Sequence, residues 1–155
     1  MSRTADNAIL TDKDPNYRVL DLSVDVFNDS HTSYFHKTIG GYSAAKLQRY
    51  QDMIDYFIIP EIQNLGNALK QSPTLSSIEG SLSQQKALNM LNAKYIIIDP
   101  NSAPINNRFA YGNAWFVKDY ELVDTPDDEI ITLKQIDPKE SAVINKEFQS
   151  IIQDK

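Results

Sequence analysis

The sequence contains 155 residues with a mass of 17.6 kDa, which is the size of one domain. Its 21 acidic and 15 basic residues give a net charge of -6, which disfavours binding to nucleic-acid phosphates. The absence of cysteine excludes disulfides, thiolate metal sites and a cysteine nucleophile, and two histidines leave little scope for a histidine-built metal site. We therefore expect no metal, no cofactor and no nucleic-acid partner.

The sequence shows neither a targeting signal nor a membrane-spanning segment. The N-terminus has no apolar core of a signal peptide. The most apolar stretches, residues 56–59 and 95–98, are far shorter than the roughly 20 residues that span a bilayer. We expect a soluble domain. This expectation holds equally if the chain is a fragment of a larger protein.

The first part of the chain predicts one short helix and one strand. Residues 4–14 are expected to form one or two helical turns before Asp14-Pro15. Residues 17–22 have the β-branched and aromatic composition of a strand. A polar loop at residues 28–33 and an irregular, aromatic stretch at residues 34–42 are expected to follow.

A long amphipathic helix is predicted next. Ser43 stands where an N-cap is expected, ahead of apolar residues at spacings of three and four. Pro60 is expected to break or kink this helix, and a second amphipathic piece continues it to about Lys70. Residues 71–80 are expected to form a loop.

Another helix and a buried strand follow. Ser81 and Gln84 match a capping box, and Asn92 is a plausible left-handed helix stop. Residues 95–98 are continuously apolar, which is typical of a fully buried strand. Residues 99–113 predict a long exposed loop, a common place for functional residues.

The last part predicts two or three strands around a helix. A strand opens at residues 114–117 and resumes or turns at residues 120–123. Thr125-Pro126 and the acidic residues after it predict a helix start, and a short strand is expected at residues 141–144. The apolar residues of the tail, 148–152, have helical spacing.

Strands separated by helical segments favour an α/β or α+β fold. We expect a single domain over residues 1–155 with its core at about residues 15–145. Its sheet is expected to be small and mixed, with about four to five strands covered by helices. Phosphate-binding glycine loops and the serine-hydrolase and zinc-protease motifs are absent.

The densest candidate site is the aromatic and basic segment at residues 31–50. Gly40-Gly41 is expected just before a helix N-terminus, where free N–H groups attract anions. The candidate ligand residues in this segment are His36, Lys37, Gly40, Gly41, Tyr42, Lys46 and Arg49. The alternative is a tight turn, aromatic residues that cover the edge of the core, and a solvated cationic helix face. His31 and His36 lack a third residue that would make a metal site.

Trp115, in the string Gly112–Phe116, is the remaining candidate. A tryptophan at a loop-to-strand junction can stack on a sugar ring or a partner protein, and its alternative role is a core anchor. The acidic residues Asp124, Asp127, Asp128 and Glu129 are explained by helix capping. No catalytic residue is predicted.

Four groups of residues occur in an order that resembles a known family: Tyr17–Leu20; Ser33–Tyr42 with Ala45–Leu47 and Arg49–Gln51; Leu88–Tyr95; and Gly112–Val117. Over about residues 15–145 the chain resembles the soluble portion of YfhO-type bacterial membrane proteins, especially those of Bacteroides-like bacteria. Members are long polytopic proteins similar to multi-spanning glycosyltransferases that use lipid-linked sugars. The resemblance implies an excised domain on the extracytoplasmic (periplasmic) face of the inner membrane, and it supplies no catalytic residue.

The resemblance and the residues 31–50 lead to one functional hypothesis. We expect a non-catalytic accessory domain that helps to position a lipid-phosphate sugar or an envelope glycan acceptor, with the transmembrane part of the parent protein as its partner. The alternative is a purely structural or protein-interaction domain that docks on the transmembrane part and has no ligand of its own. A free-standing enzyme would need a convergent acid–base pair, which the sequence does not indicate.

Overall fold

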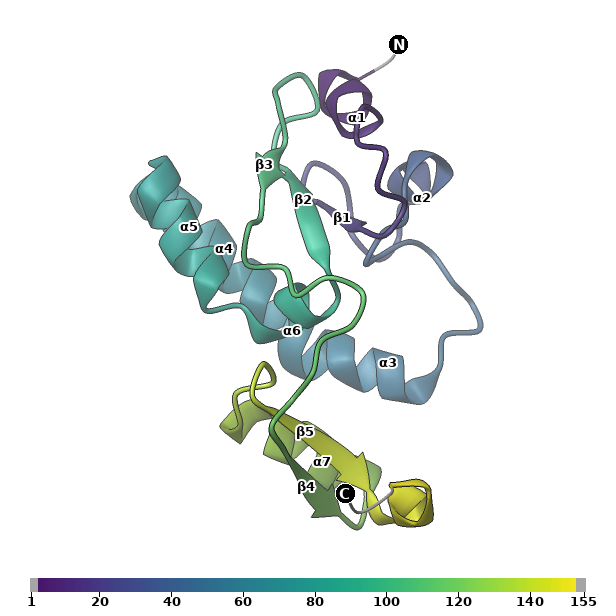
Figure 1. Ribbon diagram of the computed structural model, residues 1–155. Coiled ribbons are helices and arrows are strands. Elements are labelled where there is room, and N and C mark those ends of the chain that lie inside the picture. Colours follow the sequence, from purple (N-terminus) through teal and green to yellow (C-terminus); the bar gives the residue numbers. More distant parts are fainter. Residues whose placement is uncertain (1–2, 153–155) are drawn as a thin grey trace.

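The structure is a computed structural model that describes residues 3–152 (Figure 1). In order, the helices and strands are α1 (Thr4–Ile9), β1 (Arg18–Asp21), α2 (His31–Phe35), α3 (Gln48–Met53), η1 (Ile54–Ile58), α4 (Ile59–Gln71), α5 (Leu75–Ser83), α6 (Lys86–Met90), β2 (Ala93–Ile97), β3 (Ile105–Asn106), β4 (Asp119–Val123), α7 (Pro126–Gln135), β5 (Ser141–Asn145) and η2 (Lys146–Ile151). A run of helices from α2 to α6 separates β1 from the other strands. The predicted mixed α/β architecture is confirmed, and the described strands form two small sheets.

The first sheet has the strand order β1-β2-β3. β1 and β2 are parallel, with Leu20 opposite Ile96, and β3 pairs with β2 in the antiparallel direction. Val19, Leu20, Ile96 and Ile97 are fully buried, as expected for parallel strands covered on both faces. The strand predictions for residues 17–22 and 95–98 are therefore confirmed.

The second sheet consists of β4 and β5, which are parallel and in register from Asp119–Ser141 to Val123–Asn145. α7 forms the crossover between them. Its predicted start is confirmed: the side chain of Thr125 accepts a hydrogen bond from the N–H of Asp128, and Pro126 occupies the first turn. The predicted strand at residues 114–117 is wrong, because the strand begins at Asp119.

The long helix begins later than predicted. Residues 43–47 are not helical, and α3 starts at Gln48 with Leu47 as its N-cap. Pro60 does not break the helix: a π-helical turn, η1, precedes it, and the chain continues directly as α4. Pro60 directly follows the π-helical turn, whose wider hydrogen-bonding pattern accompanies the proline, so the helix continues through it.

Four predictions fail where tertiary packing decides the local structure. Residues 75–83, predicted mainly as loop, form α5, which buries Ile78 and Leu82 and has Thr74 as its N-cap. The predicted capping box at Ser81 is wrong, because Ser81 lies inside α5 and α6 begins at Lys86. α2 and β3 lie in segments predicted to be loops. Asn92 has φ 56°, so its left-handed conformation is confirmed.

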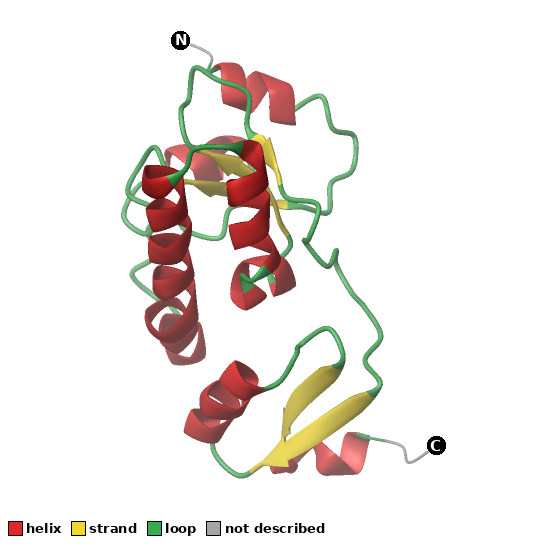
Figure 2. Ribbon diagram, turned by 90° about the vertical axis from the view of Figure 1, so that its left-hand side faces the viewer, coloured by secondary structure: helices red, strands yellow, loops and turns green. Residues whose placement is uncertain are grey.

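The structure has two lobes that share one main core (Figure 2). Residues 3–106 form the N-terminal lobe, residues 119–152 form the C-terminal lobe, and the irregular segment 107–118 joins them. Ile130 and Leu133 of α7 pack against the core of the N-terminal lobe, so α7 lies between the second sheet and α3. None of the helices between residues 3 and 152 is long and apolar enough to cross a membrane.

Glu61 of α4 is buried and holds the start of α6. Its two carboxylate oxygens accept hydrogen bonds from the N–H groups of Ala87 and Leu88, at 2.8 and 2.9 Å. Burial raises the pKa of Glu61, and the backbone hydrogen bonds from Leu88 and Ala87 act in the opposite direction. The carboxylate thus satisfies backbone donors that the short helix leaves free.

We expect Glu61→Gln to lower the free energy of unfolding by about 1–2 kcal/mol, because the amide group leaves one buried N–H without an acceptor. Urea denaturation measures the change. Glu121→Gln is the matched control, since Glu121 is exposed on β4. Equal stabilities of the two variants would show that the carboxylate does not cap α6.

Candidate functional site

A cavity of about 490 Å³ lies between the two lobes. We call it the interlobe cavity. Its walls are mainly apolar and come from α3 and α6 on one side and from α7 and β5 on the other. They include Met53, Met90, Leu91, Ile130, Leu133 and Val143. Ligand sites in proteins are typically of this size and apolar character, and they favour junctions between structural units.

Trp115 lines the interlobe cavity from the connecting segment. Its indole N–H donates to the carbonyl oxygen of Pro138 at 2.8 Å, and its ring meets that of Tyr111 edge-on, with centroids 5.0 Å apart. Trp115 is partly buried, so one side of the indole packs while the rest faces the cavities. It does not stand at the start of a strand, as predicted, but in the irregular segment before β4.

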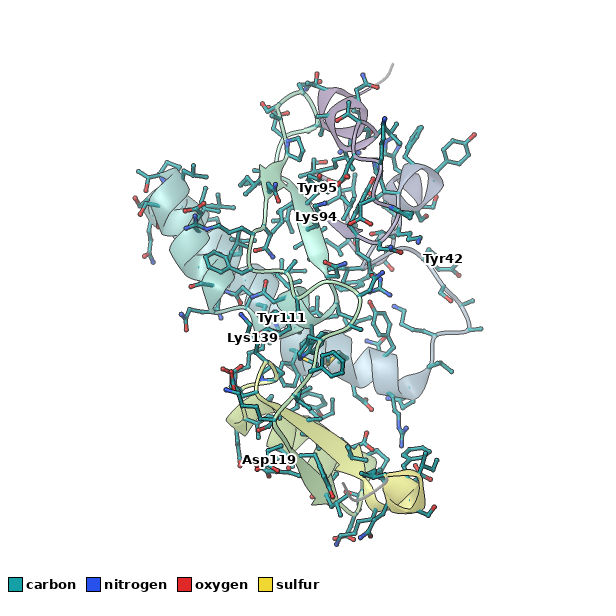
Figure 3. All side chains as sticks on the ribbon, viewed as in Figure 1. Tyr42, Lys94, Tyr95, Tyr111, Asp119 and Lys139 are labelled. Carbon is teal, nitrogen blue, oxygen red and sulfur yellow. The ribbon has the colours of Figure 1, made fainter. Side chains whose placement is uncertain are left out.

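Trp115 also lines a second cavity, of about 510 Å³, which we call the cationic cavity. Three cationic side chains, Lys86, Arg108 and Lys139, line it together with the carboxylate of Asp137. Lys86 donates to the carbonyl oxygens of Lys134 and Ile136 at the end of α7. Figure 3 shows Tyr111 and Lys139 near the junction of the lobes, and the Lys139 Nζ lies 5.9 Å from the Tyr111 ring centroid.

Arg49 lies at the rim of the interlobe cavity. Its guanidinium Nη2 is 3.5 Å from a carboxylate oxygen of Glu129 and 3.4 Å from one of Glu147. Because Arg49 belongs to α3 and both acids belong to the C-terminal lobe, these ion pairs bridge the lobes. Arg49 and Trp115, both predicted ligand residues, thus meet at one cavity.

His36 and Lys37 do not reach either of these cavities. The side chain of His36 is almost fully buried, and its Nε2 lies 3.0 Å from a carboxylate oxygen of Asp6. The Lys37 ammonium donates to the carbonyl oxygen of Pro15 at 2.8 Å. Both side chains hold the N-terminal segment against the first sheet.

Gly40 and Gly41 are not placed at a helix N-terminus, which corrects the predicted anion site. The N–H of Gly41 donates to the carbonyl oxygen of Val26 at 2.7 Å, and α3 begins only at Gln48. Gly40, Gly41 and Lys46 line a smaller cavity of about 260 Å³, where the Lys46 Nζ lies 5.4 Å from the ring centroid of Phe27. Tyr42 is largely exposed and points away from the core (Figure 3).

Tyr111 and Lys139 were not predicted as site residues. The loop at residues 99–113 carries Tyr111, so its length was the available signal, whereas nothing in the sequence marks Lys139 or Lys86. Burial raises the pKa of Tyr111, and the charges of Asp137 and Glu61 add to this effect. The phenol is therefore protonated at neutral pH and is available as a hydrogen-bond donor.

The two cavities differ in chemistry: the interlobe cavity is mainly apolar, and the cationic cavity is lined by charged side chains. Two carboxylates line the interlobe cavity: Glu129 is paired with Arg49, and Asp52 accepts a hydrogen bond from the side-chain amide of Gln48. Within residues 3–152, no group of three or more histidine or acidic side chains is arranged to hold a metal ion. No protein-family model, no curated protein and no solved structure matches the chain, so the two cavities are the basis for a functional assignment.

Proposed function

We propose that the chain is a non-catalytic extracytoplasmic accessory domain of a membrane glycosyltransferase-like protein. It helps to position a lipid-phosphate sugar or an envelope glycan acceptor for the transmembrane part of that protein. The observation that carries the proposal is the apolar interlobe cavity, with Trp115 shared between it and the cationic cavity.

The walls of the interlobe cavity suit the hydrocarbon part of such a ligand. Met53 and Met90 are flexible and polarisable, so they adapt to an irregular apolar group. Burying a hydrocarbon chain contributes roughly 0.8 kcal/mol per methylene. The ring of Trp115 offers an apolar surface at the point where the cavity meets polar groups, a position that tryptophan favours.

A second candidate function is a structural domain that docks on the transmembrane part and binds no ligand. Residues 116–120 favour it, because Phe116 and Val117 before β4 and Tyr120 within β4 are exposed. Apolar side chains gathered on a surface often mark contacts with another protein. In this reading, the same cavities are packing defects between the lobes.

Fluorescence separates the two functions, since Trp115 is the one tryptophan of the chain. We expect farnesyl phosphate, below its micelle concentration, to change the emission of Trp115 in a saturable way. Ala142→Leu should weaken this binding about ten-fold, because the larger side chain fills part of the interlobe cavity. Ala44→Leu is the matched control: Ala44 is exposed in the loop before α3 and should leave binding unchanged.

A flat titration, or equal binding by the Ala142→Leu variant, would contradict the ligand-positioning role and leave the docking function. The native gene tests the membrane part of the proposal separately. Segments of roughly 20 consecutive apolar residues on either side of this domain are expected if the parent protein is polytopic.

A further inference from the structure

The charge of the cationic cavity is opposite to that of the whole chain. Three cations, Lys86, Arg108 and Lys139, line it against one carboxylate, Asp137, although the chain has 21 acidic and 15 basic residues. A local reversal of this kind in a concave site concentrates anions, because low-dielectric walls strengthen the field inside.

The positive charge of two of these side chains is not neutralised by a carboxylate. Within residues 3–152, Lys139 forms no ion pair, and its ammonium contacts the ring of Tyr111. Lys86 is hydrogen-bonded to two carbonyl oxygens, which leaves one of its three N–H donors. Arg108 shares its charge with Glu79, at 3.1 Å between Nη2 and Oε2, but its side chain is mostly exposed.

Two uncharged side chains with hydrogen-bond donors also line the cationic cavity. Tyr111 lines the cavity, and its hydroxyl makes no hydrogen bond with residues 3–152. Gln84 also lines it, and among residues 3–152 its side-chain amide donates only to the hydroxyl oxygen of Ser83. Asp137 accepts a hydrogen bond from the backbone N–H of Lys139 at 3.0 Å, so its carboxylate is directed toward its own turn.

We propose that the cationic cavity binds a phosphate group through Lys139, Arg108 and the hydroxyl of Tyr111, with Lys86 adding charge. This inference rests on the proposed function for the identity of the ligand, whose phosphate would lie beside its apolar part at Trp115. The chemistry of the site is that of any phosphate, so inorganic phosphate and a lipid phosphate must be tested separately.

Inorganic phosphate tests the site without the apolar cavity. Titration into the ¹⁵N-labelled chain, at constant ionic strength set with sodium chloride, is expected to shift the amides of Tyr111 and Lys139 and the indole N–H of Trp115. Lys139→Gln should weaken phosphate binding about ten-fold, since a charge-assisted contact is lost. Lys13→Gln is the matched control, because Lys13 is an exposed lysine outside the cavity. Lys139→Arg, which keeps the charge, should retain most of the affinity.

Each outcome bears on a different claim. Absence of phosphate-specific shifts, or unchanged binding by Lys139→Gln, overturns the phosphate site. Ala142→Leu should bind inorganic phosphate as the unmodified chain does and farnesyl phosphate about ten-fold more weakly, which supports a shared lipid-phosphate ligand. Phosphate binding with no response to farnesyl phosphate would support the phosphate site and contradict the lipid part of the proposed function.

Discussion

Replacing Gly40 with alanine is expected to lower the free energy of unfolding by about 3 kcal/mol. A β-carbon at this position would stand 1.7 Å from the carbonyl oxygen of Val26 and 2.7 Å from its carbonyl carbon. The obstacle is backbone, so no side-chain rotation relieves it. The same Val26 oxygen accepts the N–H of Gly41, and moving it away would break that hydrogen bond as well. Urea denaturation followed by circular dichroism measures the effect.

Gly66→Ala is the matched control for this prediction. Gly66 lies inside α4, and nothing stands within 4 Å of the position that its β-carbon would take. Alanine is there expected to stabilise the chain by about 0.5–1 kcal/mol, because it restricts the unfolded backbone and favours the helix. Unchanged stability in Gly40→Ala would contradict the close approach of residues 26 and 40.

The two glycines show what the sequence pattern could not predict. A Gly-Gly pair between aromatic and basic residues indicates a turn or an anion site equally well. Its actual role, a close backbone approach, depends on Val26, which belongs to a different loop. Packing of this kind is non-local and leaves no periodic signal in the sequence. Gly41, at φ 100°, is the one of the pair that needs a left-handed backbone.

Elements with strong local signals were predicted well. Thr125 and Pro126 define the start of α7, and Asn92 takes the left-handed conformation expected of a helix stop. α2 and α5 were missed for different reasons: α2 is only five residues long, and in α5 the serines and Gly80 obscure the helical spacing of its apolar residues, such as the buried Leu82. Local composition alone does not show which face a tertiary partner will cover.

The sequence predicts only part of the candidate site, because it does not show which residues the fold brings together. Arg49 and Trp115 stood out as a cation and an aromatic residue, and the fold brings both to the interlobe cavity. His36 is also a residue type that can bind a ligand, but its side chain is buried beside Asp6. Lys139 is one of many charged residues in the sequence. Only the turn after α7 places it over Tyr111.

Among the carboxylates of the N-terminal lobe, Asp21 is the one whose substitution we expect to destabilise the fold most. It is almost fully buried at the end of β1, where one oxygen accepts from Arg3 at 2.7 Å and from Thr32 at 2.9 Å. The other oxygen accepts from the backbone and the hydroxyl of Ser23. We expect Asp21→Asn to lower the free energy of unfolding at pH 7 by about 3 kcal/mol, because the partly buried Arg3 would lose the nearer of its two carboxylate partners and keep only Asp6. Asp55→Asn, at an exposed position, should change it by less than about 0.5 kcal/mol.

Lowering the pH should reduce the difference in free energy of unfolding between the wild type and Asp21→Asn. Burial acts to raise the pKa of Asp21, but the hydrogen bonds from Ser23, Arg3 and Thr32 outweigh it and hold the pKa below its ordinary value of 3.8. A carboxyl with a lowered pKa in the folded state stabilises the fold above pH 3.8, and this contribution is lost as the pH falls through the folded-state pKa. Asp12, whose pKa is lowered to about 2 chiefly by its hydrogen bond from Lys94, affects both proteins equally and cancels in the difference. Urea denaturation at pH 7, 5 and 3 should therefore give a similar difference at the first two values and a smaller one at pH 3. A difference that stays constant or grows on acidification would show that the charge of Asp21 does not stabilise this cluster.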